Sequence, residues 1–218
     1  MFRSVSSKDI PNFGNGQGDM SINNHTNFLS RIKFIIGGRD NYPWGMALGF
    51  GKSTIGAMVN EGKAPSGPTL SNIARAENAS LTWLLEGKGQ PFLVNHYDRY
   101  EDALDYLSAM LEEEAWQPYM ITDGARYAMV LTLPGQFESK GKMIDYTLLE
   151  VVAGHGITSH AMGIAEYFRE ASPSLQSITT TAATMDDLYR GRMGTWSLVN
   201  APNALLKRAE TLPQWTAV

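Results

Sequence analysis

The sequence predicts an α+β protein in which an all-helical N-terminal domain is followed by a small α+β domain. Between positions 27 and 92, apolar residues recur at three- and four-residue spacing, which is typical of helices with one buried face. Later segments are rich in Val, Leu, Tyr and Thr and are separated by turn residues, which is typical of strands. With 218 residues, the chain is also long enough for two domains that each bury a core.

The first part of the chain divides into a tail and a helical domain. Residues 1–26 are dense in Gly, Asn and Ser and show little periodicity, so we expect a mobile N-terminal tail. The next domain, residues 27–92, is predicted to hold five short helices. Ser80 is expected to cap the last of them, and Gly87 is expected to end it. The five predicted helices cover residues 27–36, 43–48, 52–60, 69–77 and 80–87.

Residues 93–218 are predicted to form the α+β domain. An amphipathic helix is expected over 98–116, because its apolar residues fall on one face. Strands are expected over 119–121, 127–133 and 146–152, and Asp123-Gly124 is a good turn between the first two. Two further helices are expected, over 161–168 and 204–209. We recognise no family in this domain.

Composition places the chain among globular proteins and excludes several classes. Hydrophobic residues make up 43% and charged residues 18%, which is too apolar for wholesale disorder. The absence of cysteine excludes disulfides, cysteine nucleophiles and cysteine-based zinc fingers. No apolar run approaches the roughly 20 residues that span a bilayer, and no signal peptide is recognisable at the N-terminus. We therefore expect a cytoplasmic protein without membrane contact.

The net charge of −4 is unevenly distributed along the chain. Residues 27–92 hold seven Lys and Arg against four Asp and Glu, a net charge of +3. Residues 93–218 hold nine against sixteen, a net charge of −7. A basic module joined to an acidic one suits a DNA-binding domain whose neighbour is kept away from the duplex.

Five short helices within 65 residues, with a three-residue link between the second and the third, are typical of a helix-turn-helix domain. Two segments carry a more specific signal: LGFGKSTI at 48–55, followed by Asn60, and ASLTWLLEGKG at 79–89. In their order and spacing they resemble the DNA-binding domain of phage repressors of the lambdoid and Xre type. The resemblance covers residues 28–92 and implies that the third helix enters the major groove of DNA.

The resemblance also implies which residues contact DNA. Lys52, Ser53 and Ala57 occupy the family's base-contacting positions, where lysine can donate to guanine, serine can pair with several bases and alanine can contact a thymine methyl. Backbone contacts are implied for the four residues Asn41, Thr54, Asn60 and Lys63. The segment departs from the family at Gly51, where a Ser or Thr cap is usual. It departs again at Gly56, which costs about 1 kcal/mol relative to Ala inside a helix.

Enzymatic alternatives find little support in the sequence. Gly51 and Lys52 invite comparison with the phosphate-binding loop G-x-x-x-x-G-K-[ST], but the first glycine would have to stand where Met46 is. Self-cleavage by a Ser-Lys dyad would depend on Ser159 and Lys207, and neither lies in a supporting motif. His155 and His160 lack the further ligands of a zinc site. We therefore expect no catalytic residue, no metal and no cofactor.

The sequence thus predicts a sequence-specific transcriptional repressor of the phage or prophage type. We expect it to act in the cytoplasm of a bacterial host. On double-stranded operator DNA it should act as a homodimer, because one DNA-binding domain contacts too few base pairs. An antirepressor protein is a possible second partner. The alternative from another class is a protein-interaction or ligand-sensing regulator in which the helix-turn-helix is secondary.

Overall fold

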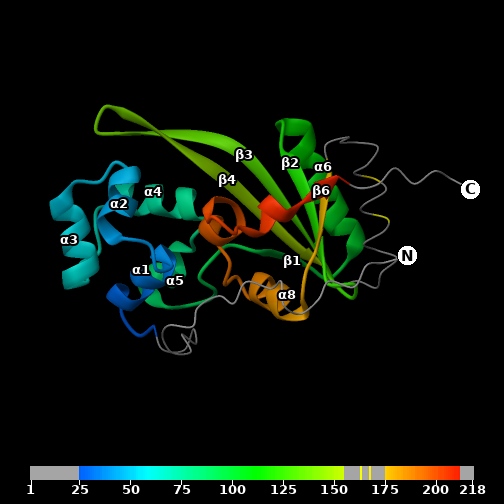
Figure 1. The fold of residues 1–218 in the computed structure, drawn as a ribbon, viewed down its shortest axis with the longest axis horizontal. Helices are drawn as coiled ribbons and strands as arrows, with labels where there is room; N and C mark the ends of the chain where they lie inside the picture. The colour runs from blue at the N-terminus through cyan, green and yellow to red at the C-terminus, as the bar shows by residue number, and fades with distance from the viewer. Residues whose placement is uncertain (1–24, 155–162, 164–166, 168–174, 212–218) are drawn as a thin grey trace, which may run out of the picture.

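The structure is a computed structural model that describes residues 25–154, 163, 167 and 175–211 (Figure 1). It shows a mixed α+β protein, in agreement with the predicted class. Nearly all of the predicted tail, 1–26, and nearly all of the predicted helix 161–168 lie outside the described residues. Within the described part of the chain, no helix combines the length and apolarity needed to cross a membrane.

Five helices form one end of the molecule (Figure 1). Their ends follow from local chemistry. The Asn27 side chain accepts a hydrogen bond from the backbone N–H of Ser30, which caps the first helix, and Gly37 ends it in the left-handed region. Ser80 caps the fifth helix and Gly87 ends it, as predicted. The helices are α1 (Phe28–Ile36), α2 (Asn41–Ala47), α3 (Lys52–Glu61), α4 (Gly67–Glu77) and α5 (Leu81–Glu86).

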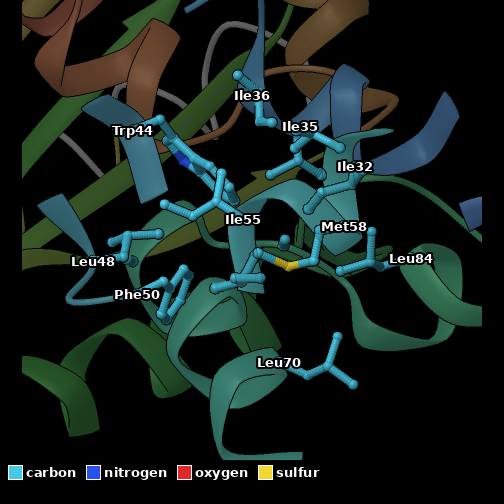
Figure 2. Packing of buried hydrophobic residues seen from close by; sticks show 14 of the residues in the cluster. Ile32, Ile35, Ile36, Trp44, Leu48, Phe50, Ile55, Met58, Leu70 and Leu84 are labelled. Atoms are coloured by element: carbon cyan, nitrogen blue, oxygen red, sulfur yellow. The ribbon is translucent and has the colours of Figure 1, made fainter. Parts of the chain in front are cut away.

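These helices share one apolar core (Figure 2). Ile32 of α1, Ile55 of α3 and Leu84 of α5 have no exposed surface, because the apolar stripe of each helix faces its neighbours. Phe137 also belongs to this core, although it lies far beyond the last of the five helices in the sequence. Side chains from both parts of the chain therefore pack in the same cluster.

The second part of the chain is built on a mixed sheet of six described strands, in the order β1-β4-β3-β2-β5-β6. The pairs β1/β4 and β2/β5 are parallel, and the other neighbours are antiparallel. The strands are β1 (Asn95–Tyr97), β2 (Gln117–Thr122), β3 (Tyr127–Ser139), β4 (Lys142–Gly154), β5 (Gln176–Thr179) and β6 (Glu210–Thr211).

Both faces of this sheet are covered, so alternate residues of one strand enter different cores. Met129 of β3 packs on the side of α6 (Tyr100–Glu113), whereas Val130 packs on the side of α8 (Ala182–Tyr189). The second face is completed by a π-helix, η2 (Trp196–Asn200), and a 3₁₀ helix, η3 (Leu205–Arg208).

The structure corrects several expectations for this part. The segment 204–209 holds the short 3₁₀ helix η3 rather than an α-helix. Strands β3 and β4 continue well beyond 127–133 and 146–152 and join at a two-residue turn. The strands β1, β5 and β6 and the helix α8 were not predicted. The unpredicted strands have four residues or fewer, which is too few for periodicity to be read.

Candidate nucleic-acid interface

Helices α2 and α3 are joined by the four residues 48–51, of which Leu48 and Phe50 are buried. The backbone of Gly49 has a φ of +76°, in the left-handed region, where glycine is favoured because it has no Cβ. The turn is tied back to α2, because the N–H of Phe50 donates to the carbonyl of Gly45 at 2.9 Å. This link fixes the direction in which α3 leaves the turn.

Gly45 lets α2 and α3 approach closely. A Cβ at this position would lie 2.5 Å from Cγ1 of Ile55 and 2.7 Å from its Cδ1. Ile55 itself is fully buried. The Ile55 side chain of α3 therefore occupies the space that any larger residue at position 45 would need.

Helix α3 has a buried face and an exposed face. Ile55, Met58 and Val59 are buried in the N-terminal core. By helical spacing, Ser53, Ala57 and Asn60 lie on the opposite side. Ser53 and Asn60 are exposed and Ala57 is half-buried, so these predicted contact residues share one accessible surface. Lys52 begins the helix and is also exposed.

The remaining predicted contact residues differ in how exposed they are and in whether the side chain is already ion-paired. Asn41, the first residue of α2, and Thr54 are half-buried. Lys63 is exposed, but its ammonium group lies 2.7 Å from the carboxylate of Glu61. The hydrogen bond to Glu61 and its negative charge raise the pKa of Lys63. A phosphate contact by Lys63 would have to replace this surface ion pair.

Tyr42 is a residue of this surface that the sequence analysis did not name. Its side chain is exposed, and its hydroxyl lies 3.5 Å from the place that a Cβ on Gly56 would take. The amide nitrogen of Asn60 lies 3.8 Å from the same point. Tyr42 and Lys52, with Met46, also line one shallow surface hollow. The sequence signal that could have identified Tyr42 was an aromatic residue on the helix before the turn.

The tip of the β3–β4 hairpin lies against the same turn. Ser139 Oγ donates to the carbonyl of Gly49 at 3.3 Å, and a Cβ on Gly49 would lie 2.7 Å from Ser139. The ammonium group of Lys140 lies 3.1 Å from the place of a Cβ on Gly51, the residue before α3. In Figure 1 the hairpin extends from the sheet toward the N-terminal helices.

A second link between the two parts of the chain surrounds Arg39. Its guanidinium group makes two 2.9 Å contacts with the carboxylate of Glu77 and lies 4.7 Å from the ring centre of Trp196 in η2. Trp44 also donates to Glu77, at 2.7 Å. Together with Tyr146, these residues line a pocket of about 470 Å³ to which both parts contribute walls.

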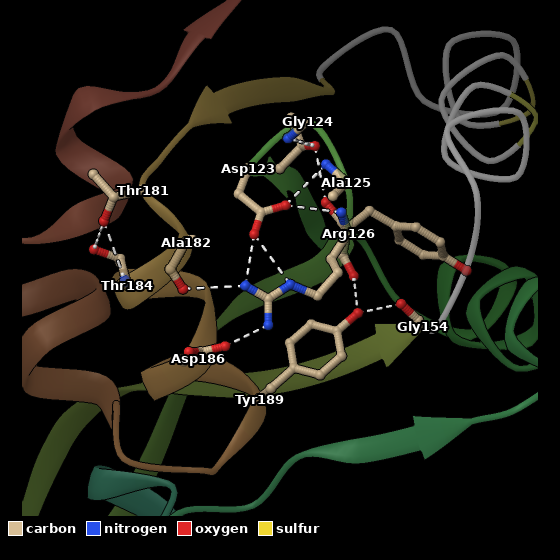
Figure 3. A network of polar contacts seen from close by, with 12 residues as sticks. Asp123, Gly124, Ala125, Arg126, Gly154, Thr181, Ala182, Thr184, Asp186 and Tyr189 are labelled. Atoms are coloured by element: carbon tan, nitrogen blue, oxygen red, sulfur yellow. Dashed lines mark hydrogen bonds and ion pairs between the residues drawn. The ribbon is translucent and has the colours of Figure 1, made fainter.

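A network of polar contacts in the second part connects the β2–β3 turn to α8 (Figure 3). Arg126 contacts Asp123 at 2.6 Å, pairs with Asp186 and donates to the carbonyl of Ala182 at 3.1 Å. Burial opposes ionisation of Asp123, but hydrogen bonds from the Arg126 side chain and from backbone N–H groups outweigh it and lower the pKa of Asp123. These contacts hold α8 to the end of the sheet, which is a structural role.

The same geometry bears on the enzymatic alternatives. Gly51 and Lys52 follow a helix, α2, and not the buried strand that a phosphate-binding loop requires. Lys207 donates to the carbonyl of Ala201 at 2.8 Å, while Ser159 lies outside the described residues. His155 and His160 lie outside them as well. In the part of the chain that the structure describes, no three His, Asp or Glu side chains are grouped to hold a metal.

Comparisons with protein-family models, with curated proteins and with solved structures found no match to this chain. The resemblance to phage repressors therefore stays a prediction, and the functional argument depends on the α2–α3 surface itself.

Proposed function

We propose that this protein binds duplex DNA through α3 and represses transcription at an operator, as phage and prophage repressors do. The observation that carries the proposal is the α2–turn–α3 unit. Gly45 admits Ile55 at the helix crossing, Gly49 turns the chain in the left-handed region, and the polar face of α3 stays accessible. A pair of helices joined by a short glycine-containing turn is the arrangement that places a second helix in the major groove.

The proposal assigns separate roles to the residues of this surface. Lys52, Ser53 and Ala57 read base edges, through donation to guanine, variable hydrogen bonding and contact with a thymine methyl, respectively. Tyr42 is exposed, and its hydroxyl adds a phosphate donor on α2, beside α3. The other backbone contacts come from Asn41, Thr54, Asn60 and Lys63.

Repression at an operator requires two copies of the DNA-binding domain. One α3 reaches few base pairs, whereas a two-fold dimer reads half-sites about 34 to 36 Å apart. We propose that residues 93–218 provide the dimer contact and that an antirepressor binds to the same part of the chain. The proposed place of action is the cytoplasm of a bacterial host. The palindromy of the bound site tests the dimer directly.

The test begins with selection of bound sites from random duplex DNA by the full chain, which yields the site and its symmetry. Affinity for the selected site is then measured over about 50 to 200 mM NaCl. We expect a steep decrease with salt and loss of sequence preference in Lys52→Ala. Lys63→Ala should weaken all duplexes alike, and Lys88→Ala, which removes an exposed lysine after α5, is the control. No binding to any duplex at low salt would overturn the proposal.

One observation favours a ligand-sensing role as the second candidate. The pocket of about 470 Å³ has walls from α2 and α4 on one side and from β4 and η2 on the other. A ligand bound there would change how the two parts contact each other, and so could regulate α3. If the intact chain binds no duplex at low salt but its melting temperature rises in a screen of small metabolites, the sensor is the better description.

A further inference from the structure

The inference rests on the proposed DNA binding and concerns the hairpin formed by β3 and β4. Residues 127–132 of β3 pair with β2 on one side and with β4 on the other, but residues 133–139 pair with β4 alone. The outer half is thus a two-stranded ribbon beyond the main sheet. Such a ribbon has marginal stability in water unless it packs against something.

The ribbon packs against the N-terminal helices. Phe137 is buried in their core, and its cross-strand partner Ile144 packs on the same cluster. Side chains two residues apart in a strand lie on the same face, so Ser139 is on the same side of the ribbon as Phe137. Directly paired residues also share a face, so Lys142, the partner of Ser139, is on that side as well. Glu138, the acidic residue of the tip, is on the opposite side.

The turn at the tip has an unusual residue. Lys140 and Gly141 connect Ser139 to Lys142, with φ angles of +51° and +75°. A two-residue turn with both angles positive favours Asn-Gly, because Asn enters the left-handed region more readily than Lys does. Backbone preference therefore does not account for a lysine here.

Three lysines belong to this region. Lys52 begins α3, and the ammonium group of Lys140 lies 3.1 Å from the place of a Cβ on Gly51, the residue before it. Lys142 pairs across the hairpin with Ser139, whose hydroxyl bonds the α2–α3 turn. All three are exposed, and within the described residues none is paired with a carboxylate. Ser139 fixes the tip at the turn by its hydrogen bond to Gly49. The positive charge on the tip is therefore held beside the part of α3 that reads bases.

We propose that the hairpin tip is a second DNA-contacting element, in which Lys140 and Lys142 bind backbone phosphates of the groove that α3 enters. The tip supplies charge and no base reading, because a lysine–phosphate contact carries no sequence information. Each contact releases counterions, so each contributes to the salt dependence of binding. The acidic second part of the chain thus contributes positive charge where the duplex lies.

The experiment uses the full chain with Lys140→Asn and Lys142→Gln combined. Asn suits the left-handed turn better than Lys, so the variant should melt at the wild-type temperature or above it. The probe is a pool of fluorescein-labelled random duplexes of about 30 bp, because phosphate contacts do not depend on sequence. Fluorescence anisotropy is followed over about 50 to 200 mM NaCl. Lys88→Gln is the control, because it removes one exposed positive charge that follows α5 and is paired with Glu86 at 2.9 Å.

We expect the magnitude of the log-log salt slope to fall by about 0.9 for each lysine–phosphate pair that the double substitution removes, and affinity near 0.1 M salt to fall roughly fivefold to tenfold for each lysine. Lys88→Gln should keep the wild-type slope. If the double variant matches the wild type, or if the control weakens binding as much, the hairpin lies outside the interface and the inference is wrong while the proposed function stands. Tighter binding by the double variant would also overturn it, since the tip would then obstruct α3. If the wild type binds no duplex, the proposed function itself fails.

Discussion

The closest approach of α2 and α3 offers a sharp test of the α2–turn–α3 geometry through Gly45→Ala. The added Cβ would meet Ile55 Cγ1 at 2.5 Å and Cδ1 at 2.7 Å, whereas carbon atoms in contact normally lie about 3.5 to 4.0 Å apart. Ile55 is fully buried, so its side chain has no free space to enter. The two helices must separate by about 1 Å to restore an ordinary contact distance.

Two opposing effects determine how much Gly45→Ala should change the free energy of unfolding. Forcing an extra methyl group into a packed core costs about 1 to 3 kcal/mol. Replacing glycine by alanine inside a helix regains about 0.5 to 1 kcal/mol. The free energy of unfolding of Gly45→Ala should therefore fall by up to about 2.5 kcal/mol, with a central value of about 1 kcal/mol, and its melting temperature by about 2 to 4 °C for each kcal/mol.

Gly56→Ala is the matched control, because it makes the same chemical change in the partner helix. A Cβ at position 56 would meet no heavy atom closer than the Tyr42 hydroxyl at 3.5 Å, an ordinary contact distance. This variant should gain the full helix preference, about 0.5 to 1 kcal/mol. Thermal and urea unfolding, followed by far-UV circular dichroism, compare the two. Equal stability of the two alanine variants would refute the close approach of α2 and α3.

Three further predictions concern stability. Glu77→Gln should cost about 3 to 5 kcal/mol in urea unfolding, because the nearly buried carboxylate accepts hydrogen bonds from Arg39 and Trp44. A loss under about 1 kcal/mol would contradict this. The stability advantage of the wild type over Asp123→Asn should be present near neutral pH and decline below about pH 4, since the lowered pKa of Asp123 means that acid must protonate a hydrogen-bonded carboxylate. An advantage that persists unchanged to about pH 2 would count against it. Burial raises the pKa of Tyr189 to about 12, so between pH 10 and 12 the unfolded chain loses this proton and the folded chain keeps it. Stability should then fall by up to about 1.4 kcal/mol per pH unit, and Tyr189→Phe should show a shallower decline in alkaline melting curves.

The N-terminal helices could be predicted because the information for them is local. Each helix carries its own apolar stripe, and capping residues such as Asn27 and Ser80 act on N–H groups three residues away. The turn at Asp123-Gly124 is local in the same sense, since Asp123 bonds the backbone of the next residues. The predicted contact residues on α3 were assigned by resemblance, and the structure adds that Ser53, Ala57 and Asn60 share an accessible face.

The outer half of the β3–β4 hairpin could not be predicted in this way. Pro134 and Gly135 interrupt the strand pattern, and both residues normally argue against a strand interior. Here Pro134 lies where β3 has a partner on one side only, so its missing N–H leaves no gap in a second ladder. Gly135 gives room to the ring of Tyr146, which would lie 2.7 Å from a Cβ at that position. The two exceptions depend on neighbours that are distant in sequence.

This hairpin also changes how the charge of the chain should be understood. Counted along the sequence, the basic residues belong to 27–92 and the acidic excess to 93–218. Counted in space, Lys140 of the acidic part lies beside Gly51, the residue before α3, because Phe137 anchors the ribbon in the core of the helices. Electrostatic attraction of a phosphate backbone depends on distance, and at physiological salt it acts over about 8 Å. The ammonium group of Lys140 lies well within this range of the start of α3, and a charge count by domain leaves it out.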